Sequence, residues 1–147
     1  MTTEVKRSAL LPYPALALFE IVNDVRRYPE FLPWCQRAEV INESADGLTA
    51  TLSLSGRGVS ESFTTRNTWV PGERINLELV SGPFKSLSGY WLFTPLADQG
   101  CRVDLHLTFQ FAGMARMFGG PFNRVFTRAA DQLVTAFCSR ASALLGQ

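Results

Sequence analysis

Two neighbouring segments indicate the architecture of this chain: CRVDLHLTFQFA at residues 101–112 and PFNRVFTRAADQLVTAFCSRASALL at residues 121–145. In the first, every second residue from Val103 to Phe111 is apolar and those between are polar, which is the period of a half-buried strand. In the second, apolar residues recur every three or four positions, which is the period of an amphipathic helix. A strand is therefore followed, after Gly113, by one long helix from about residue 121 to residue 145.

Alternation of apolar and polar residues also runs through most of the chain before residue 101. The expected strands cover residues 3–11, 35–43, 48–57, 59–70, 75–79, 84–96 and 101–112. Pro14 suits the first turn of a short helix over residues 15–22, and a second, broken helical turn is expected before residue 35. Seven strands in meander order, without a βαβ rhythm, predict an α+β protein. We expect a curved antiparallel sheet of about seven strands wrapped around the long C-terminal helix, with two short helices after the first strand.

A sheet of this size leaves space beneath a single helix. The sheet must bury its apolar face, and one helix about 10 Å wide cannot fill the trough of so broad and twisted a sheet. The remaining space is expected to be an apolar cavity, lined by side chains such as Phe63, Trp91, Phe109 and Phe126. Cavities of that kind accept apolar molecules.

Residues 28–35, YPEFLPWC, combine the prolines of a loop with large apolar side chains. Pro29 and Pro33 remove two backbone donors and exclude one long core helix. Phe31, Leu32 and Trp34 nevertheless need to be covered. This segment, which we call the lip, either closes over the protein's own core or stands at the mouth of the cavity, where it meets an apolar ligand or a membrane.

The expected strand over residues 84–96 carries large side chains on both faces. Leu87, Trp91 and Phe93 share one phase, and Phe84, Tyr90 and Leu92 share the other. A strand buried on one face has small or polar residues in its second phase. Either the outer side of this strand is covered by a neighbouring element, or it offers an apolar patch to a partner.

Length and composition narrow the class of protein. A chain of 147 residues is expected to form one domain over residues 1–147. Cys35, Cys101 and Cys138 lie far apart without a C-x-x-C pair, so reduced thiols are expected rather than a disulfide framework or a zinc site. The N-terminus lacks the apolar segment of a secretion signal, and no apolar run is long enough for a membrane span. We therefore expect a cytoplasmic protein.

The charges are unevenly distributed. A net charge of +1 argues against binding nucleic acid through the whole surface, and no DNA binding is expected. Residues 114–147, however, contain four arginines and one acidic residue. Arg116, Arg124, Arg128 and Arg140 are either the solvated face of the long helix or a docking surface for RNA or anionic lipid.

Residues that could carry catalysis are few. His106 is the sole histidine, and it lies in the polar phase of its strand, so it is expected to point away from the cavity. No spacing of metal ligands is visible, and the Gly-Arg-Gly sequence at residues 56–58 lacks the strand-to-helix context of a phosphate loop. Arg66 and Tyr90 are the candidates for a polar group inside the cavity. We expect no cofactor, no metal and no catalytic residue.

Four motifs resemble the coenzyme Q-binding START-like family, which in bacteria includes ribosome-association toxins and proteins labelled oligoketide cyclases. The motifs are YPEFLPWC at residues 28–35, FTTRN at 63–67, GPFKSLSGYWLFTPL at 82–96 and FTRAADQLVTAFCSRA at 126–141. The resemblance extends over residues 7–143 in order. It implies a helix-grip fold, in agreement with the architecture expected from the hydrophobic pattern.

The resemblance also implies function. Its first implication is non-enzymatic binding of ubiquinone or a related polyprenyl lipid, in support of respiratory electron transport and with transient contact to the inner membrane. The alternative is a toxin that binds the large ribosomal subunit and blocks its association with the small one. A third reading is an enzyme like a polyketide cyclase. The side chains expected to line the ligand cavity are Phe31, Leu32, Trp34, Phe63, Phe84, Trp91, Phe93, Phe109, Phe122, Phe126, Leu133 and Phe137, with Arg66 and Tyr90 as polar contacts.

Overall fold

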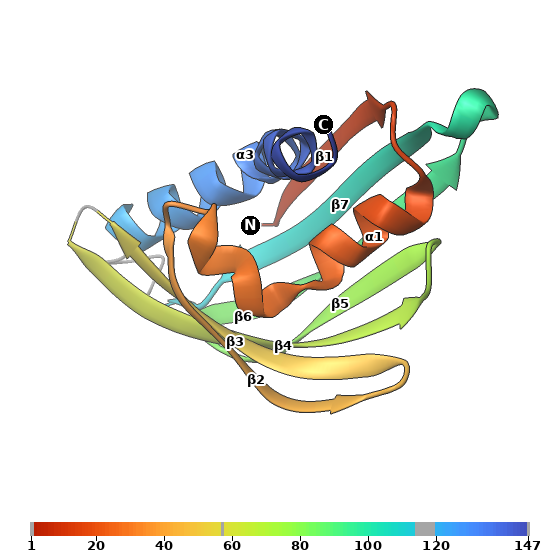
Figure 1. Cartoon of the computed structure of the whole chain (residues 1–147). Helices are drawn as coiled ribbons and strands as arrows, with labels where there is room; N and C mark the ends of the chain where they lie inside the picture. Colours follow the sequence, from red (N-terminus) through yellow and green to blue (C-terminus); the bar gives the residue numbers. More distant parts are fainter. Residues whose placement is uncertain (1, 57, 114–119, 147) are drawn as a thin grey trace.

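The computed structural model describes residues 2–56, 58–113 and 120–146 (Figure 1). The strands are β1 (Thr3–Leu11), β2 (Cys35–Ser44), β3 (Gly47–Gly56), β4 (Val59–Val70), β5 (Arg74–Ser81), β6 (Phe84–Pro95) and β7 (Cys101–Phe111). The helices are α1 (Ala15–Asn23), the 3-10 helices η1 (Val25–Glu30) and η2 (Ala97–Gln99), and the long α3 (Gly120–Leu145). The predicted seven strands, two short helices after the first strand and long C-terminal helix are confirmed.

All seven strands form one antiparallel sheet in the order β1-β7-β6-β5-β4-β3-β2. From β2 to β7 each strand pairs with the next, as the predicted meander requires. β1 does not join β2, however, and instead pairs with β7 from Thr3↔Phe109 to Leu11↔Cys101. The segment made of α1, η1 and the lip therefore carries the chain from one edge of the sheet to the other, which places these residues over the concave face.

The two main helices cover the same side of the curved sheet (Figure 1). α3 contacts β1, β4 and β7, whereas α1 contacts β5, β6 and β7. The apolar stripe of α3 faces inward, since Phe122, Phe126 and Phe137 are buried, whereas Leu144 near its end is exposed. In the described residues, no helix combines the length and hydropathy that a membrane span needs.

A bulge in β6 explains why Phe84 lies out of phase with the other inward-facing residues of this strand. The register between β6 and β7 shifts between Phe84 and Ser86, so Phe84 joins Leu87 and Trp91 on the inner face. Tyr90 lies on the outer face, where the Arg74 guanidinium stands 4.3 Å from its ring centroid and the His106 ring packs against it edge-on at 5.3 Å. Side chains of the neighbouring strands β5 and β7 thus pack on the Tyr90 ring at this outer side.

Candidate functional site

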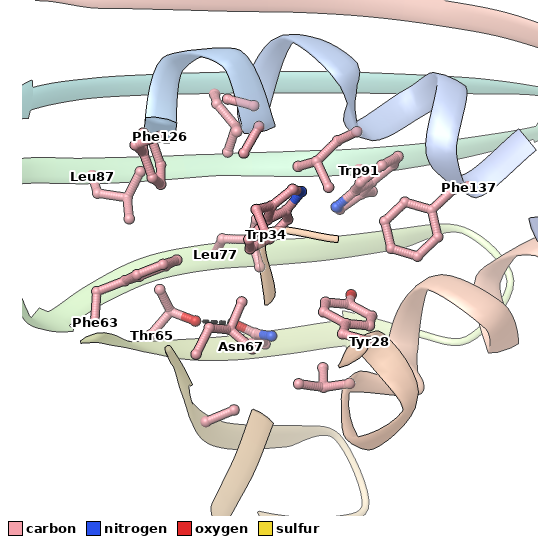
Figure 2. A pocket seen from close by; sticks show the side chains of 17 residues that line it. Tyr28, Trp34, Phe63, Thr65, Asn67, Leu77, Leu87, Trp91, Phe126 and Phe137 are labelled. Atoms are coloured by element: carbon pink, nitrogen blue, oxygen red, sulfur yellow. Dashed lines mark hydrogen bonds between the residues drawn. The ribbon is translucent and has the colours of Figure 1, made fainter. Parts of the chain in front are cut away.

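A cavity lies between the sheet and α3, where the sequence predicted one (Figure 2). It provides about 90 Å³ of space that the centre of a water-sized sphere can reach. Strands β3 to β7, helix α3, η1 and the lip all contribute to its wall. The lining residues are Val25, Tyr28, Trp34, Ala50, Leu52, Phe63, Thr65, Asn67, Leu77, Leu87, Trp91, Leu107, Phe126, Ala129, Ala130, Leu133 and Phe137.

Half of the predicted cavity residues are in this wall. They are Trp34, Phe63, Trp91, Phe126, Leu133 and Phe137. The sequence missed the small side chains Ala129 and Ala130 of α3. Their size keeps the helix from filling the space in front of the sheet, and they occur one turn after Phe126 in the same stripe.

The structure places the other six outside this wall. Phe84, Phe109 and Phe122 pack together with Phe126 at the start of α3, in edge-to-face and stacked pairs that leave no space between the rings. Phe93 packs edge-on against Phe19 of α1 at 5.9 Å. The lip residues Leu32 and Phe31 also lie outside the cavity wall: Leu32 is fully buried in the core, and Phe31 packs on α3.

Two polar side chains lie in the wall, and the sequence analysis did not select either of them. Thr65 and Asn67 follow Phe63 at alternate positions of β4, so all three point to the concave side. The Thr65 hydroxyl donates a hydrogen bond of 2.8 Å to Oδ1 of Asn67 (Figure 2). The signal available in the sequence was their phase, because they share it with Phe63 and Trp69.

The same phase rule removes Arg66 and Tyr90 as polar contacts of a ligand. Arg66 alternates with Thr65 and Asn67, so its guanidinium lies on the outer face of the sheet, within 3.5 Å of Asn42 and Thr49 oxygens. Tyr90 likewise alternates with Trp91. His106 lies on that outer face as expected, with Nε2 2.6 Å from a carboxylate oxygen of Glu4.

The lip is held against α3 by aromatic packing and one arginine. The rings of Tyr28, Phe31 and Phe137 contact one another edge-on, with centroids 5.2–6.0 Å apart. Arg140 lies 4.8 Å from the Phe31 ring centroid and donates a 2.8 Å hydrogen bond to Glu30. Some side chains of the lip thus close the core, and others, Tyr28 and Trp34, face the cavity.

Burial of the lip also affects its titratable groups. The Tyr28 hydroxyl donates a hydrogen bond to the carbonyl oxygen of Val22, and burial raises the pKa of this phenol. Burial likewise raises the pKa of the Cys35 thiol to about 11. Both groups therefore stay neutral well above physiological pH.

The predicted basic surface is only partly available. Arg124 and Arg128 are exposed one turn apart on α3, and no ion pair to either occurs in the described part of the chain. Arg140 is bound to Glu30 and its side chain is 17% exposed. Arg116 lies outside the described residues. Two exposed arginines on one face of α3 thus remain as a candidate docking surface.

Known proteins match this chain over nearly its whole length. The family described as "polyketide cyclase / dehydrase and lipid transport" matches residues 11–138. The chain belongs to this START-like family. A Pseudomonas aeruginosa protein named ribosome association toxin RatA is 49% identical, over 99% of this chain and 100% of that protein. The mitochondrial coenzyme Q-binding protein coq10 of Schizosaccharomyces pombe is 26% identical, over 92% of this chain and 85% of that protein.

A solved structure shares the fold. The Zhui aromatase/cyclase from a Streptomyces species superposes with a TM-score of 0.82 at 18% identity, and the match covers 97% of this chain and 94% of that one. At that identity the likeness shows the fold alone. The family and the helix-grip fold expected from the sequence motifs are both confirmed.

Proposed function

We propose that this protein associates with the ribosome and blocks the joining of its subunits by binding the large one. The observation that carries this proposal is the 49% identity, over the full chain, to a protein named as a ribosome association toxin. The identity to the coenzyme Q-binding relative is 26%. The sequence analysis ranked lipid binding first, and these identities favour its alternative.

The exposed face of α3 supports the proposal. Arg124 and Arg128 are four residues apart, so their guanidinium groups lie on the same side of the helix, and guanidinium groups pair well with phosphate. A protein that contacts RNA phosphates releases counterions, so its affinity falls with salt. Ribosome binding through this face should therefore be strongest at low ionic strength.

Co-sedimentation with purified ribosomal subunits tests the proposal. We expect the protein to pellet with the large subunit at low salt, to dissociate as salt rises, and to lower the yield of joined subunits in a sucrose gradient. Arg124→Glu/Arg128→Glu should bind at least tenfold more weakly and with a shallower salt dependence. The matched control is Arg26→Glu/Arg37→Glu, which makes the same charge change at exposed residues of η1 and β2. Absence from both subunits at low salt would refute the proposal.

We further infer that the cavity binds an apolar molecule without catalysing its conversion. The supporting observation is the cavity itself, whose wall consists of apolar side chains apart from Thr65, Asn67 and the polar ends of Tyr28 and Trp side chains. At about 90 Å³ it is smaller than the engineered cavity of about 150 Å³ that accepts benzene. A polyprenyl lipid therefore requires the cavity to widen, and η1 and the lip are the parts of the wall that do not belong to the sheet or α3.

Native mass spectrometry and lipid extraction of the purified protein test this second function. Each buried CH₂ group contributes about 0.8 kcal/mol, so a few isoprene units suffice for micromolar binding after the costs of association. We expect a co-purified apolar molecule, or uptake of a short-chain ubiquinone that changes the fluorescence of Trp34 and Trp91. Finding neither would exclude ligand binding while leaving the ribosome proposal intact.

A further inference from the structure

Asn67 is a buried amide in an apolar wall. Asn67 is 6% exposed and lies in the middle of β4. Its partners on the neighbouring strands are Leu48 of β3 and Leu77 of β5. A polar group in such a place is destabilising unless it is hydrogen-bonded. Leucine has nearly the same shape and would avoid that penalty. The presence of asparagine therefore calls for a partner.

The protein satisfies one end of this amide. Oδ1 accepts the hydrogen bond from Thr65, whereas none of the hydrogen bonds in the described part of the chain uses Nδ2. In Figure 2 the nitrogen lies on the side of the amide away from Thr65, among the side chains that line the cavity. An amide nitrogen carries two N–H donors and cannot accept. Two donors are thus directed at the cavity.

The other polar groups of the wall have the same character. The indole N–H groups of Trp34 and Trp91 are donors only, and neither is used in a hydrogen bond within the residues that the structure describes. The hydroxyl protons of Thr65 and Tyr28, in contrast, are already donated, to Oδ1 of Asn67 and to the carbonyl oxygen of Val22.

We propose that Asn67 selects the ligand of the cavity by donating a hydrogen bond from its side-chain amide to an acceptor group, such as a ketone carbonyl, on a mostly apolar molecule. This inference rests on the proposed ligand-binding function and adds the chemical class of the ligand to it. Apolar contact supplies affinity, and the amide of Asn67 supplies the choice between molecules of similar shape.

A pair of small molecules with the same shape tests the inference. Cyclohexanone and methylenecyclohexane differ in one group, C=O against C=CH₂, and their affinities can be measured from ¹H–¹⁵N NMR titrations of the whole protein. A neutral hydrogen bond changes an affinity about twofold to tenfold. Asn67→Leu should therefore lower the ratio of ketone affinity to alkene affinity by about that factor. The matched control is Asn76→Leu, the same substitution on the outer face of β5, where Asn76 accepts from Arg74.

The wild-type protein provides a second readout that needs no variant. The side-chain amide signals of Asn67 should shift with the ketone and stay nearly still with the alkene, because only the ketone accepts a hydrogen bond. Equal shifts with both molecules, or an affinity ratio that Asn67→Leu leaves unchanged, would overturn the role of Asn67 while ligand binding itself stands. Binding of neither molecule would also overturn this inference, whereas the ligand-binding function is decided separately by native mass spectrometry and lipid extraction.

Discussion

Phe126 joins the aromatic core to the cavity, so its truncation tests both parts of the structure at once. Its ring is 6% exposed and lies 4.8 Å from Phe84, 4.9 Å from Phe109 and 5.6 Å from Phe63. Its other side faces the cavity. In Phe126→Ala the core therefore loses one ring that contacts five others, and the cavity becomes larger.

The expected loss of stability follows from these contacts. Phenylalanine-to-alanine changes in protein cores lower the free energy of unfolding by about 3–5 kcal/mol. For Phe126→Ala the loss of unfolding free energy should fall near the upper end of this range. Each edge-to-face ring pair adds about 0.5–1.5 kcal/mol, and the cavity already beside Phe126 keeps neighbouring side chains from moving in to fill the new space. Domains of this size are stable by about 5–15 kcal/mol, so we expect a folded but severely weakened protein.

Urea denaturation followed by circular dichroism measures this loss. With a slope of about 2 kcal/mol per molar urea, the midpoint should fall by about 2 M. Arg124→Ala, an exposed change on the same helix, is the control and should alter the free energy of unfolding by less than about 0.5 kcal/mol. Saturating benzene should restore part of the midpoint in Phe126→Ala through binding to the enlarged cavity. A loss below about 1 kcal/mol would show that α3 does not pack as described.

Further outcomes concern the lip, one close contact in the sheet, and pH. Trp34→Asp should weaken ligand uptake about tenfold or more and Phe31→Asp by less, because Trp34 lines the cavity whereas Phe31 packs beside it; normal uptake of a short-chain ubiquinone by both would reduce the lip to core closure. Gly89→Ala should lower the free energy of unfolding by about 1–3 kcal/mol in urea titrations, because a Cβ atom there would collide with the backbone carbonyl oxygen of His106; a neutral result would contradict this strand approach. The pKa of Cys35 rises from its ordinary value of 9.0 to about 11 on folding, so as pH increases the thiol loses its proton first in the unfolded state. The contribution of Cys35 to the free energy of unfolding is therefore complete below pH 9 and should decline toward pH 11. Cys35→Ala should flatten that decline in urea midpoints measured between pH 8 and pH 10.5, and identical pH profiles would exclude this cause.

Local periodicity predicted the elements of this fold because it reports which side of each element is buried. In β7 the residues Val103, Leu105, Leu107 and Phe109 are all buried, as their alternation required. The same rule gave the wrong face for Phe84, since a bulge adds one residue to the register and moves this ring to the inner side. Bulges leave no local signal in an apolar segment, so that position could not be placed from the pattern.

Where the cavity ends depends on the position of each residue along its strand or helix. Periodicity shows only which side of the element a residue faces. Leu107 and Phe109 share one face of β7, yet Leu107 lines the cavity and Phe109 lies in the packed aromatic core. The difference arises from where α3 crosses the sheet. Large rings of α3 close the space at one end, and Ala129 and Ala130 leave it open further along. Thr65 and Asn67, in contrast, could have been found, because polar residues in the buried phase of a strand stand out.

The pairing of β1 with β7 has a consequence for biosynthesis. Leu11 and Cys101 are partners in the sheet although they are 90 positions apart in the chain. At a translation rate of about 5–20 residues per second, β7 is synthesised on the order of ten seconds after β1, and β1 lacks its pairing partner during that time. The helix that covers the concave face emerges later still. If the protein acts on ribosomes as proposed, it therefore cannot acquire its binding shape until residues 101–145 have been synthesised.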